Sequence, residues 1–267
     1  MQSKSSFHTE TDRRQRYLGE FLIDSGYHVI LAETSPELDL AAASISEFEN
    51  KLLVLLPVPA SSVLLRRLKE SLTPQHIVLG GNIPKDFTAF CDERKIAYID
   101  YFKNPAIAIE NAVATAEGAI CEAILTSEYN LHQSEALVIG FGKCGEILAD
   151  KLEGLKCNVT VSTRDAIAKA RAKAYGYHLL SDSSYQQFDL LFNTAPAPVL
   201  GRSIIDQLKP DAVIIDIASA PGGTDFNYCA EKGIAAKHCP GIPGRYSPKT
   251  SAKILFDHIQ EKLSNLL

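Results

Sequence analysis

The chain has 267 residues, of which 46% are hydrophobic and 22% are charged, and its formal net charge is −5 at pH 7. These values are typical of a folded globular protein, and they exclude a disordered chain or a coiled coil. A negative balance without a basic stripe argues against a nucleic-acid-binding surface. No apolar run reaches the roughly 18 residues that a membrane-spanning helix needs.

The N-terminal segment and the cysteines indicate in which cellular compartment the protein is expected. The segment from Met1 to Arg16 is polar, so no secretory signal peptide is expected. No two of the six cysteines form a C-x-x-C pair, which favours reduced thiols and disfavours structural zinc. We therefore expect a cytoplasmic protein without a metal site, a nucleic-acid partner or a membrane partner.

Short apolar runs alternate with helical patterns in the first hundred residues, a sign of repeated βα units and a parallel sheet. The expected strands are Tyr27–Leu31, Leu52–Leu56, His76–Leu79 and Ala97–Ile99. The expected helices are Arg14–Ser25, Ser61–Ser71 and Phe87–Arg94.

A long helical segment, Pro105–Thr126, is rich in alanine, which lets helices approach closely. A second βα series follows it. Its expected strands are Ala136–Ile139, Asn158–Ser162, Leu190–Asn193, Ala212–Asp216 and Ala235–His238. Its expected helices are Cys144–Leu155, Asp165–Tyr175, Arg202–Leu208 and Phe226–Lys232.

The chain ends in another helical pattern, Pro248–Leu267, which we expect to return to the first domain. The sequence thus predicts an α/β protein with two Rossmann-like parallel-sheet domains flanking a cleft, the first domain being discontinuous. The expected division is a substrate or partner domain of residues 1–104 plus 248–267, a linker helix at 105–130 and an NAD(P)-binding Rossmann domain at 131–247.

The strongest motif is a glycine-rich turn between a strand and a helix. The strand Ala136–Ile139 runs directly into Gly140-Phe141-Gly142-Lys143-Cys144-Gly145. In a dinucleotide-binding turn, the first glycine permits the tight turn, the second lets a pyrophosphate approach the backbone, and the third lets the helix pack on the strand. The free N–H groups of the helix N-terminus then face the phosphates.

The end of the next strand bears on the choice of cofactor. NAD sites usually carry an acidic residue there, whereas this chain has Ser162-Thr163-Arg164. Hydroxyls and a guanidinium suit a 2′-phosphate, which favours NADP over NAD. Asp165 follows at once, and it is either that acidic group or the cap of the next helix.

Two further turns follow strand ends, where open α/β sheets bind their ligands. They are Asn193-Thr194-Ala195-Pro196 and Asp216-Ile217-Ala218-Ser219. We expect them to line a nicotinamide pocket, with Asn193, Thr194, Ala195, Pro196, Ile217 and Ala218 contacting the cofactor. The alternative is that they are ordinary turns chosen for backbone geometry.

In order along the chain, these residues resemble the A subunit of dipicolinate synthase, and the resemblance covers nearly the whole chain. The other matching pieces are Asp12-Arg13-Arg14-Gln15, Thr115-Ala116-Glu117-Gly118, the run from Ala220-Pro221-Gly222-Gly223-Thr224 to Phe226, and the run from Pro240-Gly241-Ile242-Pro243-Gly244 to Thr250. The family commonly has Arg before Pro-Gly-Gly, where this chain has Ala220.

The resemblance implies the oxidation of a dihydro- or hydroxytetrahydrodipicolinate to dipicolinate, with hydride passing to a nicotinamide, in sporulation. It also implies that the partner is the flavoprotein-like B subunit of dipicolinate synthase. A small dicarboxylate substrate needs cations, and Arg245 and Lys249 are the candidates. The alternative for both is solvated surface charge.

Three other features have two interpretations each. Glu117 is either a general base or one partner of an ion pair. The turn Gly222-Gly223-Thr224 either presents its N–H groups to an anion or is a tight loop before a helix capped by Asp225. His238 is more typical of a hydrogen-bonded core residue than of an acid–base group.

Two other functions stay open. One is a non-catalytic NADP(H)-binding subunit or sensor, which Ala220 favours. The other is an enzyme similar to the 2-hydroxyacid dehydrogenases, which share the two-domain plan. In each case we expect a homo-oligomer.

Overall fold

The structure is a computed structural model, and it describes residues 12–32, 52–181 and 184–266. The chain forms two compact units. Unit 1 consists of Met1–Ala108 and Ser247–Leu267, and unit 2 consists of Ile109–Tyr246. The first boundary lies inside the 22-residue helix α5 (Pro105–Thr126), so most of this helix belongs to unit 2.

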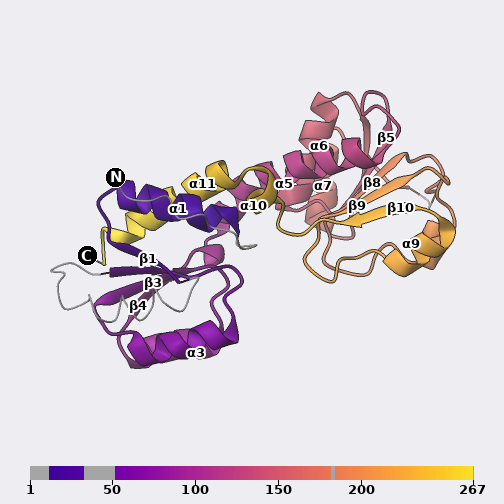
Figure 1. Ribbon diagram of the computed structural model, residues 1–267. Coiled ribbons are helices and arrows are strands. Elements are labelled where there is room, and N and C mark those ends of the chain that lie inside the picture. The colour runs from indigo at the N-terminus through magenta and orange to yellow at the C-terminus, as the bar shows by residue number, and fades with distance from the viewer. Residues whose placement is uncertain (1–11, 33–51, 182–183, 267) are drawn as a thin grey trace. The chain divides into compact units, whose positions relative to one another are not determined.

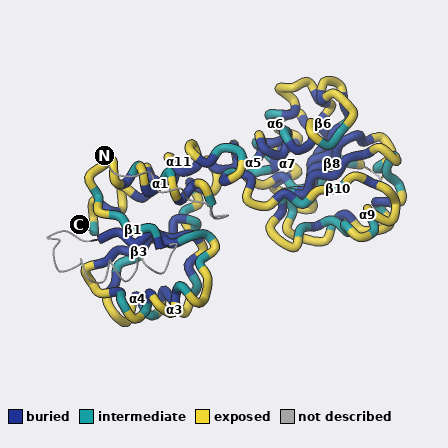
Figure 2. Tube along the Cα trace, in the orientation of Figure 1, coloured by how far each residue is buried: buried dark blue, intermediate teal, exposed yellow. Residues whose placement is uncertain are grey.

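Unit 1 is built on a parallel sheet with the strand order β1-β2-β3-β4. These strands are β1 (Val29–Leu31), β2 (Leu52–Leu55), β3 (His76–Gly80) and β4 (Ala97–Asp100). Alternation along β2 divides the core, because Leu53 and Leu55 face one helical layer and Val54 faces the other. The first layer contains α1 (Arg13–Asp24) and α11 (Pro248–Leu263), and the second contains α3 (Ser62–Ser71) and α4 (Lys85–Glu93) (Figures 1 and 2).

Side-chain caps explain where two helices of unit 1, α1 and α3, begin. The Asp12 carboxylate accepts a hydrogen bond from the Arg14 amide, and the Ser61 hydroxyl accepts one from the Leu64 amide at 3.2 Å. After β4 the chain forms a short 3₁₀ helix, η2 (Tyr101–Lys103), whose Tyr101 hydroxyl accepts a hydrogen bond from the buried Gln15 side chain.

Unit 2 contains a parallel sheet with the strand order β10-β9-β8-β5-β6-β7. Its strands are β5 (Glu135–Ile139), β6 (Asn158–Ser162), β7 (His178–Leu179), β8 (Leu190–Asn193), β9 (Val213–Asp216) and β10 (Ala235–His238). Strands β5, β6 and β7 follow one another toward one edge of the sheet. The chain then returns to the other side of β5, where β8, β9 and β10 follow one another toward the opposite edge. The switch between β5 and β8 is where doubly wound sheets bind nucleotides, at the carboxyl ends of the strands.

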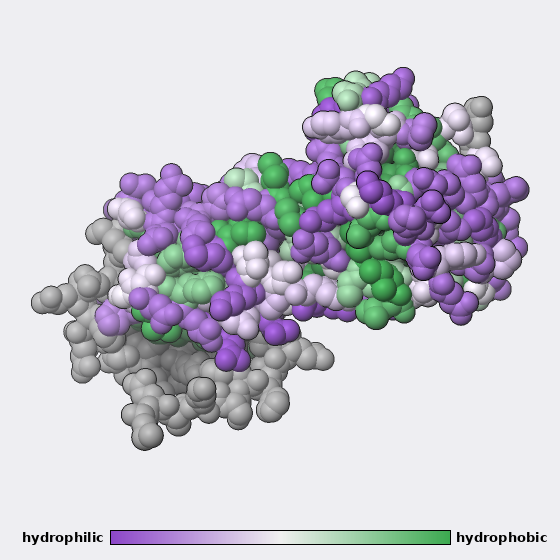
Figure 3. All heavy atoms as spheres, turned by 90° about the horizontal axis from the view of Figure 1, so that it is seen from above, coloured by the Kyte–Doolittle hydropathy of each residue, from purple (hydrophilic) through white to green (hydrophobic). Residues whose placement is uncertain are grey.

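Helices cover both faces of this sheet, and its strands are the most buried part of unit 2 (Figure 2). Side chains of α5, α6 (Lys143–Gly154) and α7 (Ala166–Ala174) pack with Val138 on one face. Side chains of α8 (Arg202–Ile205) and α9 (Phe226–Lys232) pack with Leu137 on the other. Figure 3 shows polar side chains over much of the surface of unit 2, with apolar patches between them.

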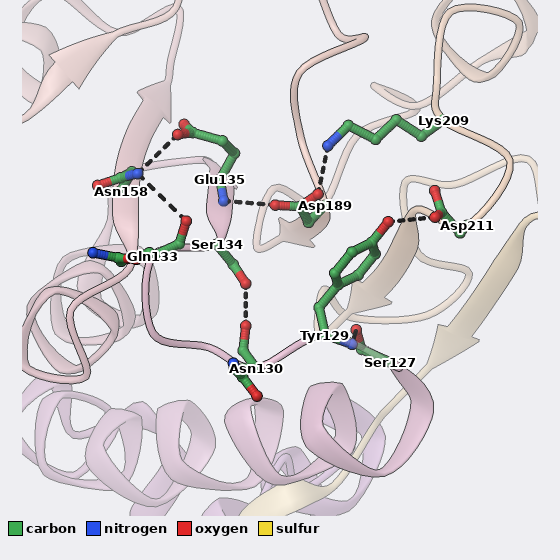
Figure 4. A network of polar contacts seen from close by, with 10 residues as sticks. All are labelled: Ser127, Tyr129, Asn130, Gln133, Ser134, Glu135, Asn158, Asp189, Lys209 and Asp211. Carbon is green, nitrogen blue, oxygen red and sulfur yellow. Dashed lines mark hydrogen bonds and ion pairs between the residues drawn. The ribbon is translucent and has the colours of Figure 1, made fainter.

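A polar network ties the loops at the opposite, amino edge of the same sheet (Figure 4). The Asp189 carboxylate accepts hydrogen bonds from the Glu135 amide at 2.8 Å and from the Lys209 ammonium at 2.5 Å. Nearby, the Tyr129 hydroxyl donates to Asp211. These contacts fix the amino ends of β5 and β8, and thereby help to fix the positions of their carboxyl ends.

The α/β class with two parallel sheets is confirmed, and most elements differ from the expected ranges by a few residues. Three short elements of the described residues have no counterpart among the expected strands and helices. The two-residue strand β7 is too short to show alternation, η2 is a single turn, and α10 (Ile242–Tyr246) lies in a Pro- and Gly-rich segment. Among the described residues, no helix is both long and apolar enough to span a membrane.

Candidate functional site

The glycine turn lies at the switch point of the unit 2 sheet. Strand β5 ends at Ile139, and Gly140 adopts a φ of +90°, a left-handed conformation that favours glycine. The Gly140 amide donates a hydrogen bond to the Ser162 carbonyl at 2.8 Å, and α6 begins three residues later at Lys143. The first amide to bond inside this helix is that of Glu146, which donates to the Gly142 carbonyl. The amides of Lys143, Cys144 and Gly145 therefore have no partner within the helix.

The three glycines meet different surroundings. A methyl group on Gly140 would lie 2.4 Å from the Thr194 hydroxyl, and one on Gly145 would lie 2.2 Å from the Gly140 carbonyl oxygen. A methyl group on Gly142 would meet nothing within 4 Å. The first and third glycines therefore allow close packing of the protein on itself, while the second borders open space at a helix N-terminus.

Arg171, on α7, contacts this turn, although nothing in the sequence pattern connects the two. Its guanidinium donates to the Phe141 carbonyl at 3.2 Å and lies 2.8 Å from the Glu146 carboxylate. Arg171 thus connects the glycine turn, through Phe141, to the first turn of α6, through Glu146. Phe141 itself is buried in the core against Tyr177, so only its backbone is available to a ligand. Burial raises the pKa of the half-buried Cys144 thiol, in keeping with a small packing residue.

A pocket of about 350 Å³ opens beside the turn at the carboxyl end of β6. Its lining includes Gly140 from the turn, Ser162, Thr163 and Arg164 from the strand end, and Tyr185. Arg164 is exposed and lines this pocket together with Tyr185, whose pKa is raised by burial and lowered by the charge of Arg164. Asp165, the alternative acidic residue, caps α7 by accepting a hydrogen bond from the Ala168 amide at 2.6 Å.

The turns after β8 and β9 are held by two fully buried side chains, those of Asn193 and Asp216. Asn193 accepts a hydrogen bond from the Ala195 amide and donates one to the Ala195 carbonyl. Thr194 binds back to the Ile139 carbonyl through both its amide and its hydroxyl. Pro196 is exposed at the end of this turn. These contacts tie the turn after β8 to the end of β5, beside the glycine turn.

Asp216 organises the other turn. Its carboxylate accepts hydrogen bonds from the Ala218 amide at 3.0 Å, the Gly223 amide at 2.8 Å and the Thr224 hydroxyl at 2.7 Å. The Gly222 amide donates to the Ser219 carbonyl. The Gly222 and Gly223 amides and the Thr224 hydroxyl therefore already have partners inside the protein, which supports the tight-loop interpretation. Asp225 caps α9, as that interpretation expects.

Two titratable residues singled out in the sequence have structural partners. His238 contacts the Ala218 carbonyl at 3.0 Å through Nε2, as expected of a hydrogen-bonded core residue. Glu117 is exposed on α5 and pairs with Lys151 of α6 at 2.9 Å. Lys151 lies eight residues beyond the start of α6, or roughly 12 Å along the helix axis. This contact supports the ion-pair interpretation of Glu117.

Arg245 belongs to a polar cluster centred on the buried Glu122, a residue without a signal in the sequence. Glu122 is only 5% exposed, and its carboxylate lies 3.0 Å from the Arg245 guanidinium and 3.4 Å from the Lys237 ammonium. The Tyr246 hydroxyl also donates to it at 2.6 Å, which raises the pKa of Tyr246 to about 12. Lys249 lies in unit 1, exposed in the first turn of α11.

This cluster predicts a pH dependence of stability. The pKa of Glu122 is lowered, first by the hydrogen bond from Tyr246 and then by Lys237 and Arg245. A carboxylate with a lowered folded-state pKa stabilises the fold above its unfolded value, and that contribution is lost as the pH falls through the lowered value. Urea unfolding measured from neutral pH to below 4.5 should show a steeper loss of unfolding free energy in the wild type than in Glu122→Gln. Parallel pH profiles would contradict this.

The comparisons with known proteins agree with the geometry of unit 2. A family model described as "D-isomer specific 2-hydroxyacid dehydrogenase, NAD binding domain" matches residues 108–222. This range includes the glycine turn, the pocket beside β6 and both later turns. The match supports a nicotinamide dinucleotide as the cofactor and an oxidoreductase-like protein.

The chain is similar to A subunits of dipicolinate synthase over most of its length. The A subunit of dipicolinate synthase from Bacillus subtilis (strain 168) is 32% identical over 199 residues, which are 73% of this chain and 67% of that protein. The crystal structure of the A subunit from Bacillus halodurans superposes with a TM-score of 0.73 at 24% identity, covering 89% of this chain and 98% of that one. The crystal structure of the Bacillus subtilis protein gives 0.76 at 24% identity, covering 95% and 93%. The structural matches show the shared fold, and the sequence match shows that the chain belongs to the family of dipicolinate synthase A subunits.

Proposed function

We propose that the chain is an NADP-dependent oxidoreductase that converts dihydrodipicolinate, or hydroxytetrahydrodipicolinate, to dipicolinate in sporulation. The observation that carries this proposal is the glycine turn. Three helix amides without intrahelical partners border the open space at Gly142, at the switch point of a parallel sheet.

The residues around the turn fit a dinucleotide. The amides of Lys143, Cys144 and Gly145 would hold the pyrophosphate, and the pocket beside β6 would hold the adenosine half. The turns after β8 and β9 would line the nicotinamide half, through Thr194, Ala195, Pro196, Ile217 and Ala218, while the fully buried Asn193 would hold the first of these turns in place. A bound nicotinamide ring supplies the hydride acceptor.

The groups at the end of β6 support NADP rather than NAD. Ser162, Thr163, Arg164 and Asp165 all line this pocket, and one carboxylate oxygen of Asp165 is already used to cap α7. Hydroxyl groups and a guanidinium donate hydrogen bonds, and a 2′-phosphate accepts them.

This choice of cofactor gives a direct prediction. Replacing Arg164 with methionine should weaken NADPH binding about 30-fold and leave NADH binding nearly unchanged, because only NADPH carries the phosphate. Titration calorimetry with both nucleotides measures the difference. Lys173→Met is the matched control, since Lys173 is exposed in the last turn of α7, away from the pocket. Equal losses for both nucleotides in Arg164→Met would exclude a role in selecting the phosphate.

Arg245 and Lys249 are the cations that we propose for the substrate carboxylates. In the oxidation of the dihydro ring, a hydride leaves for the cofactor and one proton is released. The hydroxytetrahydro ring also loses one water.

The flavoprotein-like B subunit of dipicolinate synthase is the proposed partner. The function is tested by adding either ring substrate to the protein and NADP, with and without that partner, and following absorbance at 340 nm together with dipicolinate. Tight NADP binding with no turnover in either case would overturn it.

One set of observations favours a second function, a non-catalytic NADP(H)-binding subunit or sensor. Glu117, Asp216 and His238 all have partners within the protein, and Ala220 stands where the family commonly has Arg. The turnover measurement above separates this function from the enzyme.

A further inference from the structure

The cluster around Glu122 joins three elements of unit 2. Glu122 belongs to α5, Lys237 to β10, and Arg245 and Tyr246 to α10. Its location follows from the chain path, because α10 begins a few residues after the carboxyl end of β10. Packing fixes α10 there, since a methyl group on Gly118 of α5 would lie 2.2 Å from the Ile242 side chain.

The charges of this cluster do not cancel. Two cations, Lys237 and Arg245, share the single carboxylate of Glu122, which leaves a formal charge of +1. The carboxylate is buried, with 7% of its side chain exposed, whereas the side chains of Lys237 and Arg245 are 46% and 54% exposed. The surplus positive charge is therefore accessible to a ligand, while the negative charge that orients it is not.

The Arg245 guanidinium is held in a fixed orientation. One terminal nitrogen, Nη2, donates to Glu122 at 3.0 Å, and the guanidinium carbon lies 5.3 Å from the centre of the Tyr246 ring. The Tyr246 hydroxyl is itself fixed by Glu122. A guanidinium has five N–H donors in a planar fork, so the contact with Glu122 leaves donors available for a second carboxylate.

The place of the cluster in the sheet suits the substrate of a dinucleotide enzyme. The pyrophosphate turn follows β5, and the adenosine pocket lies on the β6 side of it. The reacting half of the dinucleotide must then extend toward β8, β9 and β10. Strand β10 is the third strand from β5 in that direction, at roughly 14 Å for a spacing of about 4.8 Å between strands.

We propose that Lys237 and Arg245, oriented by the buried Glu122, form a binding site for one carboxylate of the ring substrate. Glu122 is a positioning residue in this site. The inference rests on the proposed function for the identity of the ligand, and it adds two residues, Lys237 and Glu122, that the motif analysis did not identify. The other role open to the cluster is to tie β10 and α10 to α5 without binding a ligand.

The test is the binding of dipicolinate, the stable dianionic product, measured by titration calorimetry with NADP present. Lys237→Met and Arg245→Met should each weaken dipicolinate binding about tenfold, as loss of a charge-assisted hydrogen bond does. Lys232→Met is the matched control, because Lys232 pairs with Asp206 on the other helical layer of the same unit. Its affinity for dipicolinate should equal that of the wild type.

Glu122→Gln distinguishes an oriented site from a simple excess of charge. This substitution removes a negative charge, so an unspecific electrostatic attraction would become stronger. If Glu122 positions the two cations, dipicolinate binding should instead weaken severalfold, while NADP binding stays within about twofold of the wild type. Circular dichroism establishes that each variant is folded, and Arg245→Lys replaces Arg245→Met if the latter unfolds.

The outcomes separate this inference from the proposed function. If the wild type binds NADP and dipicolinate, and the variants bind dipicolinate as tightly as the wild type does, the site is wrong and the proposed function stands. Stronger binding in Glu122→Gln, or no dipicolinate binding by the wild type, also overturns the site. If dipicolinate binding depends on these residues but no turnover occurs with any ring substrate, the proposed function fails and the site stands.

Discussion

Replacement of Gly145 with alanine should destabilise unit 2 by about 3 kcal/mol or more and abolish dinucleotide binding. The added methyl group would lie 2.2 Å from the Gly140 carbonyl oxygen, and this neighbour is backbone that cannot rotate away. Relief requires α6 to move off β5, which disrupts the core between them and displaces the helix N-terminus. Urea unfolding measures the loss of stability, and nucleotide titration measures the loss of binding.

Gly142→Ala is the matched variant that separates binding from folding. Gly142 has a φ of −95°, which alanine adopts without strain, and its methyl group would meet nothing within 4 Å. The unfolding free energy should therefore change by less than about 1 kcal/mol. Dinucleotide affinity should nevertheless fall at least about tenfold, because the methyl group would occupy the space that the pyrophosphate needs. Wild-type binding in this variant would contradict the placement of the phosphates.

Asp216→Asn should have the second large effect, again about 3 kcal/mol or more. The Asp216 side chain is fully buried, and both of its oxygens only accept hydrogen bonds, from the Ala218 amide, the Gly223 amide and the Thr224 hydroxyl. An asparagine amide keeps the shape but turns one acceptor into a donor. A buried donor would then face another donor, and the hydrogen bonds on that side would be lost.

The same substitution should also weaken nucleotide binding, since the turn that carries Ile217 and Ala218 loses its anchor. Asp211→Asn is the control, because Asp211 is exposed at the amino edge of the same sheet, where it accepts a hydrogen bond from Tyr129. Its stability should change by less than about 1 kcal/mol. If Asp216→Asn proved as stable as this control, the buried carboxylate would not be what holds the two loops together.

The amino-acid sequence by itself determined the α/β class, the positions of most strands and helices, and the glycine turn. These features depend on local rules. Strand β5 and helix α6 have different hydrophobic periods, and the change between them falls on Gly140 to Gly145, where few other residues could sit. The resemblance to the A subunit of dipicolinate synthase was also present in the sequence, since it rests on short runs of residues.

Only the tertiary structure decided which charged groups meet. Glu117 and Glu122 both lie on α5, little more than one helical turn apart. From the sequence, a role was proposed only for Glu117. Folding exposes Glu117 beside Lys151, and it buries Glu122 against Lys237 and Arg245, which are more than 100 residues away along the chain. Such pairs depend on how strand β10 and helix α10 pack on α5. Packing over that separation leaves no periodic trace in the sequence, whereas a turn of six neighbouring residues does.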